Sequence, residues 1–248
     1  MKIYTLGTSH GATEYMRSCS VNLLEVDGAY YLFDCGGDAE SKITNLGIEP
    51  NSIRAIFISH MHVDHATSLP AMAKRYALHY NKTAAHADVF LPEDEAISAF
   101  MHWVSAMHAG PPRAHFEFFE MKAVTPGVLY EDEHVRVTAI PTRHIEGGKY
   151  PSYAYMVEGE GKTFLYTGDL APDFSDYPQV LFERDFDAVL SELVHFDVEK
   201  NLPDIIKTRT KKLIFTHLGL KKIPLVLAEC DKFPYNVYIA TDGEAFDI

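Results

Sequence analysis

Apolar and polar residues alternate or cluster in short stretches along most of the chain, a pattern typical of β-strands joined by tight turns. The first third predicts three strands, at 2–6, 20–26 and 29–34. Asp27 and Gly28 separate the last two strands, and this dipeptide favours a two-residue hairpin turn. A β-hairpin is therefore predicted close to the amino terminus.

Helices and further strands follow. Helices are predicted at 41–46, where Gly47 is a plausible C-cap, and at 68–80, with a buried strand at 54–59 between them. A second series of strands begins after residue 120, at 135–140, 153–158, 163–167, 188–191, 212–216 and 236–240. Polar residues follow at or just past four of the strand ends, namely His144, Asp169, His195 and His217. Strands mixed with helices, with functional groups at strand ends, predict a layered α/β architecture.

Residues 92–122 differ from their surroundings because they are rich in phenylalanine, methionine and histidine. The dipeptide Pro111-Pro112 divides this segment. One interpretation is a lid or specificity insertion, in which Trp103, Phe116 and Phe119 contact a substrate. The other is an ordinary helix that buries Phe100, Val104 and Met107 on one face, and a dimer contact is left open as well.

Composition narrows the functional classes. The chain has 248 residues, of which 47% are hydrophobic and 23% charged, so it is long enough for a sizeable core and too hydrophobic to be disordered. Its apolar runs are far too short to span a bilayer. Three scattered cysteines and the absence of a secretory pattern at the amino terminus predict a cytoplasmic protein. A formal net charge of −13 argues against long nucleic acid as a partner.

The candidate chemistry is concentrated in the stretch from Ser59 to His65. His60, His62, Asp64 and His65 lie within six positions of one another, directly after a predicted buried strand. Histidine and aspartate are common ligands of zinc and similar ions, and such a polar cluster would be unfavourable in a folded protein without a compensating metal. His60 and His62 are two residues apart and point the same way at a strand end, whereas Asp64 and His65 can serve another direction. One loop could thus feed two metals.

This stretch resembles the HxHxDH signature of the metallo-β-lactamase superfamily, whose fold is a four-layer αβ/βα sandwich. Other superfamily motifs resemble segments that occur here in the same order: Phe33-Asp34-Cys35-Gly36, Thr142-Arg143-His144, Thr167-Gly168-Asp169, Thr216-His217-Leu218-Gly219 and Asp242-Gly243. The resemblance covers nearly the whole chain, and the ordered set is highly specific. It implies a single domain over residues 1–248.

The resemblance also implies a ligand set for two divalent ions, with zinc preferred and manganese or iron as alternatives. One ion would be held by His60, His62 and His144, and the other by Asp64, His65 and His217. Asp169 would bridge the two ions, and Asp34 would fix the ligand loop from behind. Asp64 is placed in the catalytic set as well as the metal set, and no organic cofactor is predicted.

His195 directs the prediction toward phosphodiester cleavage. Its position between Asp169 and His217 resembles the branch that contains ribonuclease Z and a bacterial cyclic phosphodiesterase, as does the stretch Leu6-Gly7-Thr8-Ser9. In that branch a histidine donates a proton to the leaving oxygen, and Glu192 resembles the glutamate that orients it. The predicted reaction is attack by a metal-bridging hydroxide on a small or cyclic phosphodiester, with His195 as general acid.

Alternatives remain open. A hydrolase of lactones, thioesters or β-lactams could use the same metals, although the lactonase branch commonly has a tyrosine shortly after the bridging aspartate and this chain has none before Tyr177. A non-catalytic metal-binding regulator is a third reading, disfavoured because all seven ligand positions are filled. The short stretch between His144 and Asp169 leaves no room for a tRNA-gripping arm. The predicted partner is therefore a small phosphate ester, without long nucleic acid or membrane, and a homodimer is left open.

Overall fold

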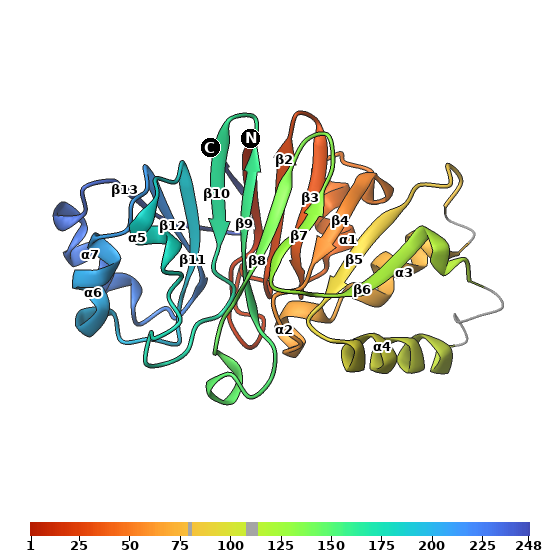
Figure 1. Cartoon of the computed structure of the whole chain (residues 1–248), viewed down its shortest axis with the longest axis horizontal. Helices are drawn as coiled ribbons and strands as arrows, with labels where there is room; N and C mark the ends of the chain where they lie inside the picture. Colours follow the sequence, from red (N-terminus) through yellow and green to blue (C-terminus); the bar gives the residue numbers. More distant parts are fainter. Residues whose placement is uncertain (79–80, 108–113) are drawn as a thin grey trace.

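The computed structural model describes residues 1–78, 81–107 and 114–248, and within these ranges two seven-stranded sheets pack face to face (Figure 1). The first sheet has the spatial order β14 (Glu244–Asp247), β1 (Lys2–Gly7), β2 (Val21–Val26), β3 (Ala29–Cys35), β4 (Ile53–Phe57), β5 (Ala87–Leu91), β6 (Phe119–Ala123). The second has the order β13 (Asn236–Ile239), β12 (Lys212–Leu218), β11 (Ala188–Leu193), β10 (Lys162–Tyr166), β9 (Tyr153–Gly159), β8 (Arg136–Pro141), β7 (Gly127–Glu131). Each sheet is antiparallel on one side and parallel on the other.

Helices cover the outer face of each sheet, and this gives four layers. Those on the first sheet are α1 (Ala39–Asn45), α2 (Val63–Ala66), α3 (Leu69–Ala77) and α4 (Asp94–Ala106). Those on the second are α5 (Val180–Glu183), α6 (Val198–Ile206) and α7 (Ile223–Ala228). Figure 1 shows the two helical layers at opposite ends of the long axis. The predicted four-layer αβ/βα sandwich is confirmed.

The strand β4 illustrates why these residues form buried strands. Ala55 and Phe57 point into the core between the sheets, where Phe57 stacks on Phe33 with the ring centroids 5.1 Å apart. Ile56 and Ile58 point the other way, into the core beneath the helices. Because side chains alternate across a strand, a strand covered on both faces reads as an unbroken apolar run.

Several predicted elements shift at their ends for local reasons. The hairpin turn is as predicted, because Asp27 and Gly28 both have positive φ and Val26 pairs with Ala29. Strand β4 ends two residues before the predicted Ser59, whose backbone N–H donates instead to the Asp34 carboxylate at 2.7 Å. The helix predicted at 68–80 is α3, which ends at Ala77; residues 79–80 lie outside the described residues.

The segment 92–122 contributes helix α4 and edge strand β6 to the first sheet. Phe100 and Val104 are buried beneath α4, as the helix interpretation predicts, but Met107 is 45% exposed. Pro111-Pro112 and His108 lie outside the described residues. A lid function for this segment stays a prediction.

Candidate metal centre

The carboxyl ends of β4, β8 and β10 bring four predicted ligands together at the lower edge of the two sheets (Figure 1). His60, His62, His144 and Asp169 each offer one nitrogen or oxygen, and these atoms lie within 4.8 Å of one another. The Oδ2 atom of Asp169 is 3.7 Å from His60 Nε2 and 3.6 Å from His144 Nε2. The Nδ1 atom of His62 faces the same point, 2.9 Å from His60 Nε2.

A second group of ligands adjoins the first. Asp64, His65 and His217 also offer atoms within 4.8 Å of one another. Oδ2 of Asp169 is 3.4 Å from His65 Nε2 and 3.2 Å from His217 Nε2, so this carboxylate lies between the two groups. The structure therefore brings together all seven side chains of the predicted ligand set, in the predicted two groups.

The chemical state of these groups fits divalent cations. His65 Nε2 and Asp169 Oδ1 are buried and have no hydrogen-bond partner among the described residues. Unpartnered buried polar atoms are unfavourable and call for an ion or water. Burial, together with the neighbouring His65, lowers the pKa of His60 well below its usual range. Burial and then His144 lower the pKa of His62. Both shifts favour the neutral imidazole, which is the form that binds metal.

Asp34 organises the centre from behind. It is fully buried at the end of β3, and its Oδ2 accepts hydrogen bonds from His65 Nδ1 at 2.6 Å and Ser59 Oγ at 3.0 Å. The hydroxyl of Tyr166, which comes from the other sheet, donates to the same oxygen. Because His65 donates from Nδ1, its Nε2 lone pair is directed at the metal centre. The predicted supporting place of Asp34 agrees with this geometry.

The backbone is strained or crowded where it places ligands. His217 has φ of +48° and is the extra residue of a β-bulge in β12, since Thr216 pairs with Glu192 and Leu218 with Leu193. Bulges redirect side chains, so His217 turns toward Asp169. The sequence prediction placed His217 just after the strand, whereas β12 continues to Leu218. Gly36 is equally constrained, because a Cβ atom there would lie 1.6 Å from the carbonyl oxygen of Asp64.

His195 and Glu192 form a pair at the edge of the centre. Glu192 is fully buried, and its Oε1 accepts a hydrogen bond from His195 Nδ1 at 3.0 Å. Its other oxygen accepts the backbone N–H of both Val194 and His195 at 2.8 Å. His195 Nδ1 is 3.7 Å from Asp169 Oδ2. Burial alone would lower the pKa of His195, but the hydrogen bond and charge of Glu192 raise it above the usual value.

The amino-terminal loop makes contacts that the sequence prediction missed. The backbone N–H of Gly11 donates to Asp64 Oδ2 at 2.7 Å, and the His10 ring meets the His217 ring edge to face at 6.2 Å. Asp242 anchors this loop by accepting hydrogen bonds from Thr8 and Ser18. His10 is not among the site residues predicted from the sequence. Two sequence motifs could have directed attention to this loop: Leu6-Gly7-Thr8-Ser9, which leads into it, and Asp242-Gly243, which anchors it.

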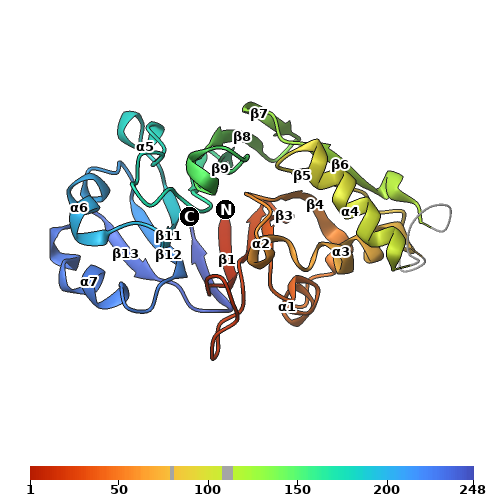
Figure 2. The ribbon, with the colours of Figure 1, turned by 90° about the horizontal axis from the view of Figure 1, so that it is seen from below.

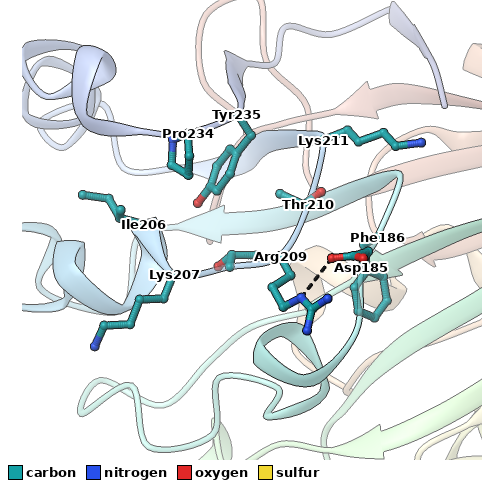
Figure 3. Close-up of a pocket in the computed structure, with 10 residues that line it drawn as sticks. Asp185, Phe186, Ile206, Lys207, Arg209, Thr210, Lys211, Pro234 and Tyr235 are labelled. Carbon is teal, nitrogen blue, oxygen red and sulfur yellow. Dashed lines mark hydrogen bonds and ion pairs between the residues drawn. The ribbon is translucent and has the colours of Figure 1, made fainter.

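A surface pocket, separate from the candidate metal centre, lies at the amino ends of β11, β12 and β13 (Figure 3). The candidate metal centre lies at the opposite, carboxyl ends of the strands. The rim of the pocket carries three basic side chains, and each has an acidic partner. Lys207 pairs with Asp204 at 2.8 Å, Arg209 with Asp185 at 2.9 Å and Lys211 with Asp187 at 2.8 Å. Neutralised cations of this kind do not make an anion-binding site by themselves.

Comparison with known proteins places this architecture in a family. Residues 1–216 match the family model described as Anti-Pycsar protein Apyc1. The chain belongs to this family. The match ends at Thr216, one residue before the last predicted ligand, and includes the other six.

The Apyc1-family chain is also similar to ribonuclease Z of Anoxybacillus flavithermus, with 31% identity over 160 residues that cover 63% of this chain and 48% of the relative. The chain thus spans about half the length of the curated relatives it matches. Among solved structures, the metallo-β-lactamase fold protein YhfI from Bacillus subtilis has a TM-score of 0.78 at 18% identity, covering 99% of each chain. Human tRNase Z, short form, has a TM-score of 0.74 at 18% identity, covering 100% of this chain and 99% of that one.

The solved structures confirm the predicted fold, and the curated relatives include ribonuclease Z, a member of the branch that the sequence motifs resemble. They contradict one prediction. Long nucleic acid was excluded as a partner, yet the curated relatives are ribonucleases and a tRNase shares the fold. The net charge of −13 misled because it sums over the whole chain, whereas binding to RNA depends on the charge of the contacting surface alone. Among the described residues, no helix has both the length and the apolar character needed to cross a membrane.

Proposed function

We propose that this chain is a metal-dependent phosphodiester hydrolase in which His195 donates a proton to the leaving oxygen. The observation that carries this proposal is the pair of His195 and Glu192 beside Asp169, the carboxylate shared by both ligand groups. An alkoxide is a poor leaving group, so a positioned acid favours cleavage of an alkyl ester.

Each residue has a definite task in this scheme. His60, His62 and His144 would hold one ion, Asp64, His65 and His217 the other, and Asp169 would contact both. Two divalent ions, zinc by preference, would supply a nucleophile from water at neutral pH and offset the charge of the phosphate. Asp34 keeps the Nε2 lone pair of His65 directed at the centre. Asp64 is held in turn by the backbone N–H of Gly11.

The proton donor is prepared by its surroundings. Glu192 accepts hydrogen bonds from Nδ1 of His195 and from the backbone N–H groups of Val194 and His195. These bonds fix the position of the carboxylate relative to the imidazole. With Nδ1 engaged, Nε2 is the nitrogen that can deliver a proton. The raised pKa of His195 keeps the ring protonated to higher pH than a free histidine would be.

A small or cyclic phosphodiester is the substrate class we favour. The connection from His144 to Asp169 consists of a short turn and the hairpin β9–β10, which stays within the second sheet. This connection therefore contains no additional segment that could extend from the sheet to bind a tRNA. RNA is still a substrate to be tested on equal terms, because the relatives named above are ribonucleases. A cytoplasmic location also remains our expectation.

A carbonyl-directed reaction is less well supported. Tyr177 is the first tyrosine after Asp169, and its hydroxyl is 2.8 Å from the hydroxyl of Thr208. Its ring is buried in the core between the second sheet and the helices that cover that sheet. Tyr177 is therefore committed to the core and cannot contact a substrate carbonyl in the manner of a lactonase tyrosine.

A substrate panel tests the proposal. Protein of known metal content is assayed with bis-p-nitrophenyl phosphate, a cyclic mononucleotide, a precursor tRNA, a lactone and a β-lactam. We expect metal-dependent turnover of phosphodiesters that exceeds turnover of the two carbonyl substrates. Faster cleavage of the lactone or β-lactam would overturn the proposal, and faster cleavage of the tRNA would overturn its substrate class.

A further inference from the structure

An apolar cavity of about 270 Å³ lies between helices α2 and α4, next to the candidate metal centre. Met61 and Val63 line one side, and each is flanked in sequence by predicted metal ligands. Trp103 on α4 lines the other side. Figure 1 shows α2 and α4 at the lower edge of the molecule, and both helices face the viewer in Figure 2, which is seen from below. The stretch that carries the candidate ligands His60 and His62 therefore also supplies one wall of the cavity.

Three of the large apolar side chains that line the cavity are exposed to solvent. The exposed fraction is 37% for Met61, 68% for Val63 and 48% for Trp103. Leu69 and Phe100, which also line the cavity, are buried and anchor it to the core beneath the first sheet. Clustered exposed apolar side chains beside a polar site mark a place where a ligand or partner binds.

The size and chemistry of the cavity limit what it can hold. Its volume is just below the range of roughly 300 to 1,000 Å³ typical of sites for whole small molecules. It therefore suits one flat ring system rather than a complete ligand. An indole exposed at its edge can stack on such a ring, and this contact does not depend on the identity of the base.

The positions of three histidines orient a substrate relative to the cavity. The ring of His144 contacts the rings of both His62 and His195, with centroids 5.0 Å and 4.5 Å apart respectively. His62 belongs to the stretch after β4 whose neighbours Met61 and Val63 line the cavity, whereas His195 follows β11 in the second sheet. A phosphodiester with its leaving oxygen at His195 would direct its second ester group toward the cavity.

We infer that this cavity binds a flat aromatic substituent, such as a nucleobase, carried by the ester oxygen that is retained in the product, with Trp103 stacked against it. This inference rests on the proposed function, because it assumes that a phosphodiester occupies the metal centre. It assigns Trp103 to substrate selection and gives it no part in bond cleavage.

Two esters with the same leaving group provide the kinetic test: the p-nitrophenyl ester of thymidine 5′-phosphate and methyl p-nitrophenyl phosphate. We expect Trp103→Ala to raise KM for the thymidine ester about tenfold or more, with kcat nearly unchanged and the methyl ester barely affected. Trp103→Phe should retain most of the affinity. Leu227→Ala removes an exposed apolar side chain of α7, remote from the cavity, and serves as the matched control.

A spectroscopic test is available because Trp103 is the only tryptophan of the chain. Titration of the metal-loaded protein with thymidine 5′-phosphate should quench its emission with a Kd close to the inhibition constant measured with the ester. Methyl phosphate at the same concentrations should leave the emission unchanged. The binding readout does not require turnover, so it remains informative if neither ester is hydrolysed and the proposed function fails.

Three outcomes would overturn the inference. Competitive inhibition by thymidine 5′-phosphate without a change in emission would place the base elsewhere. Equal increases in KM for both esters would show that the cavity does not select the retained group. Conversion of a dimer to a monomer by Trp103→Ala in sedimentation, with both KM values unchanged, would make the cavity a contact between copies of the chain.

Discussion

The Oδ2 atom of Asp34 lies 2.6 Å from Nδ1 of His65, and both side chains are fully buried. This contact fixes which nitrogen of His65 faces the candidate metal centre. It also joins the end of β3 to helix α2, and the Tyr166 hydroxyl extends the network to the second sheet. The interface between the two sheets and the arrangement of the ligands are therefore parts of one hydrogen-bond network.

Asp34→Asn should weaken metal binding without unfolding the chain. The amide preserves the shape of the side chain and tolerates the φ of +60° at this position, but it loses the charge that His65 requires. Changes in such supporting groups typically reduce metal affinity roughly 10- to 100-fold. Competition with a chromophoric chelator measures the affinity. Asp38→Asn, at the cap of α1, is the matched control, and equal affinity in both variants would remove Asp34 from the account.

The candidate ligands could be predicted from the sequence, whereas the contacts of the amino-terminal loop could not. The ligands were predictable because four of them lie within six residues and the others follow strand ends in a familiar order. The contact of Gly11 with Asp64 was not, since it depends on how residues 8–18 return across the edge of the sheets. Strand β14 was missed for a similar reason: it is short, and it is defined by pairing with β1 at the opposite end of the chain.

Local periodicity also misjudged where some elements end. The bulge that turns His217 toward Asp169 arises from pairing of β12 with β11, which no pattern within β12 encodes. The overall composition misled about partners for a related reason, because a net charge carries no information on where the charges lie. Motifs therefore predicted which side chains lie together better than composition predicted the partner.

Removal of metal should destabilise the fold. The centre buries His60, His65 and Asp169, and two of these carry atoms without a partner among the described side chains and backbone. An ion present at about 1,000 times its Kd stabilises the native state by roughly 4 kcal/mol. We expect Tm to fall by several degrees after chelation and to recover when zinc is restored, as followed by calorimetry. A Tm indifferent to chelation would count against a metal centre in this place.

Gly36→Ala should disturb the ligand loop specifically. Its Cβ atom would collide with the Asp64 carbonyl oxygen, so the backbone that carries Asp64 and His65 must shift. We expect a loss of stability of roughly 1 to 3 kcal/mol together with weaker metal binding. Gly28→Ala is the control, because it has positive φ but open space around it, far from the ligands. If both variants bind metal as the wild type does, the close approach at Gly36 has no bearing on the centre.

The pH dependence should report on Glu192. A general acid acts in its protonated form, and Glu192 raises the pKa of His195, so activity should persist to higher pH than a free histidine would allow. Glu192→Gln removes the charge and lowers that pKa, so the basic limb of kcat/KM for an alkyl ester should move to lower pH. The exposed Glu199→Gln should leave the profile unchanged. An unshifted pH profile in Glu192→Gln would contradict the claim that Glu192 raises the pKa of His195.

The most direct test of phosphodiester cleavage with His195 as the acid is the leaving-group dependence of His195→Ala. Turnover of a phosphodiester with an alkyl leaving group should fall about 10²- to 10⁴-fold, because the alkoxide then departs without a proton. Turnover of a p-nitrophenyl ester should fall less than about tenfold, since that leaving group needs no acid. Equal losses on the two substrates, at unchanged metal content, would contradict the assignment of His195.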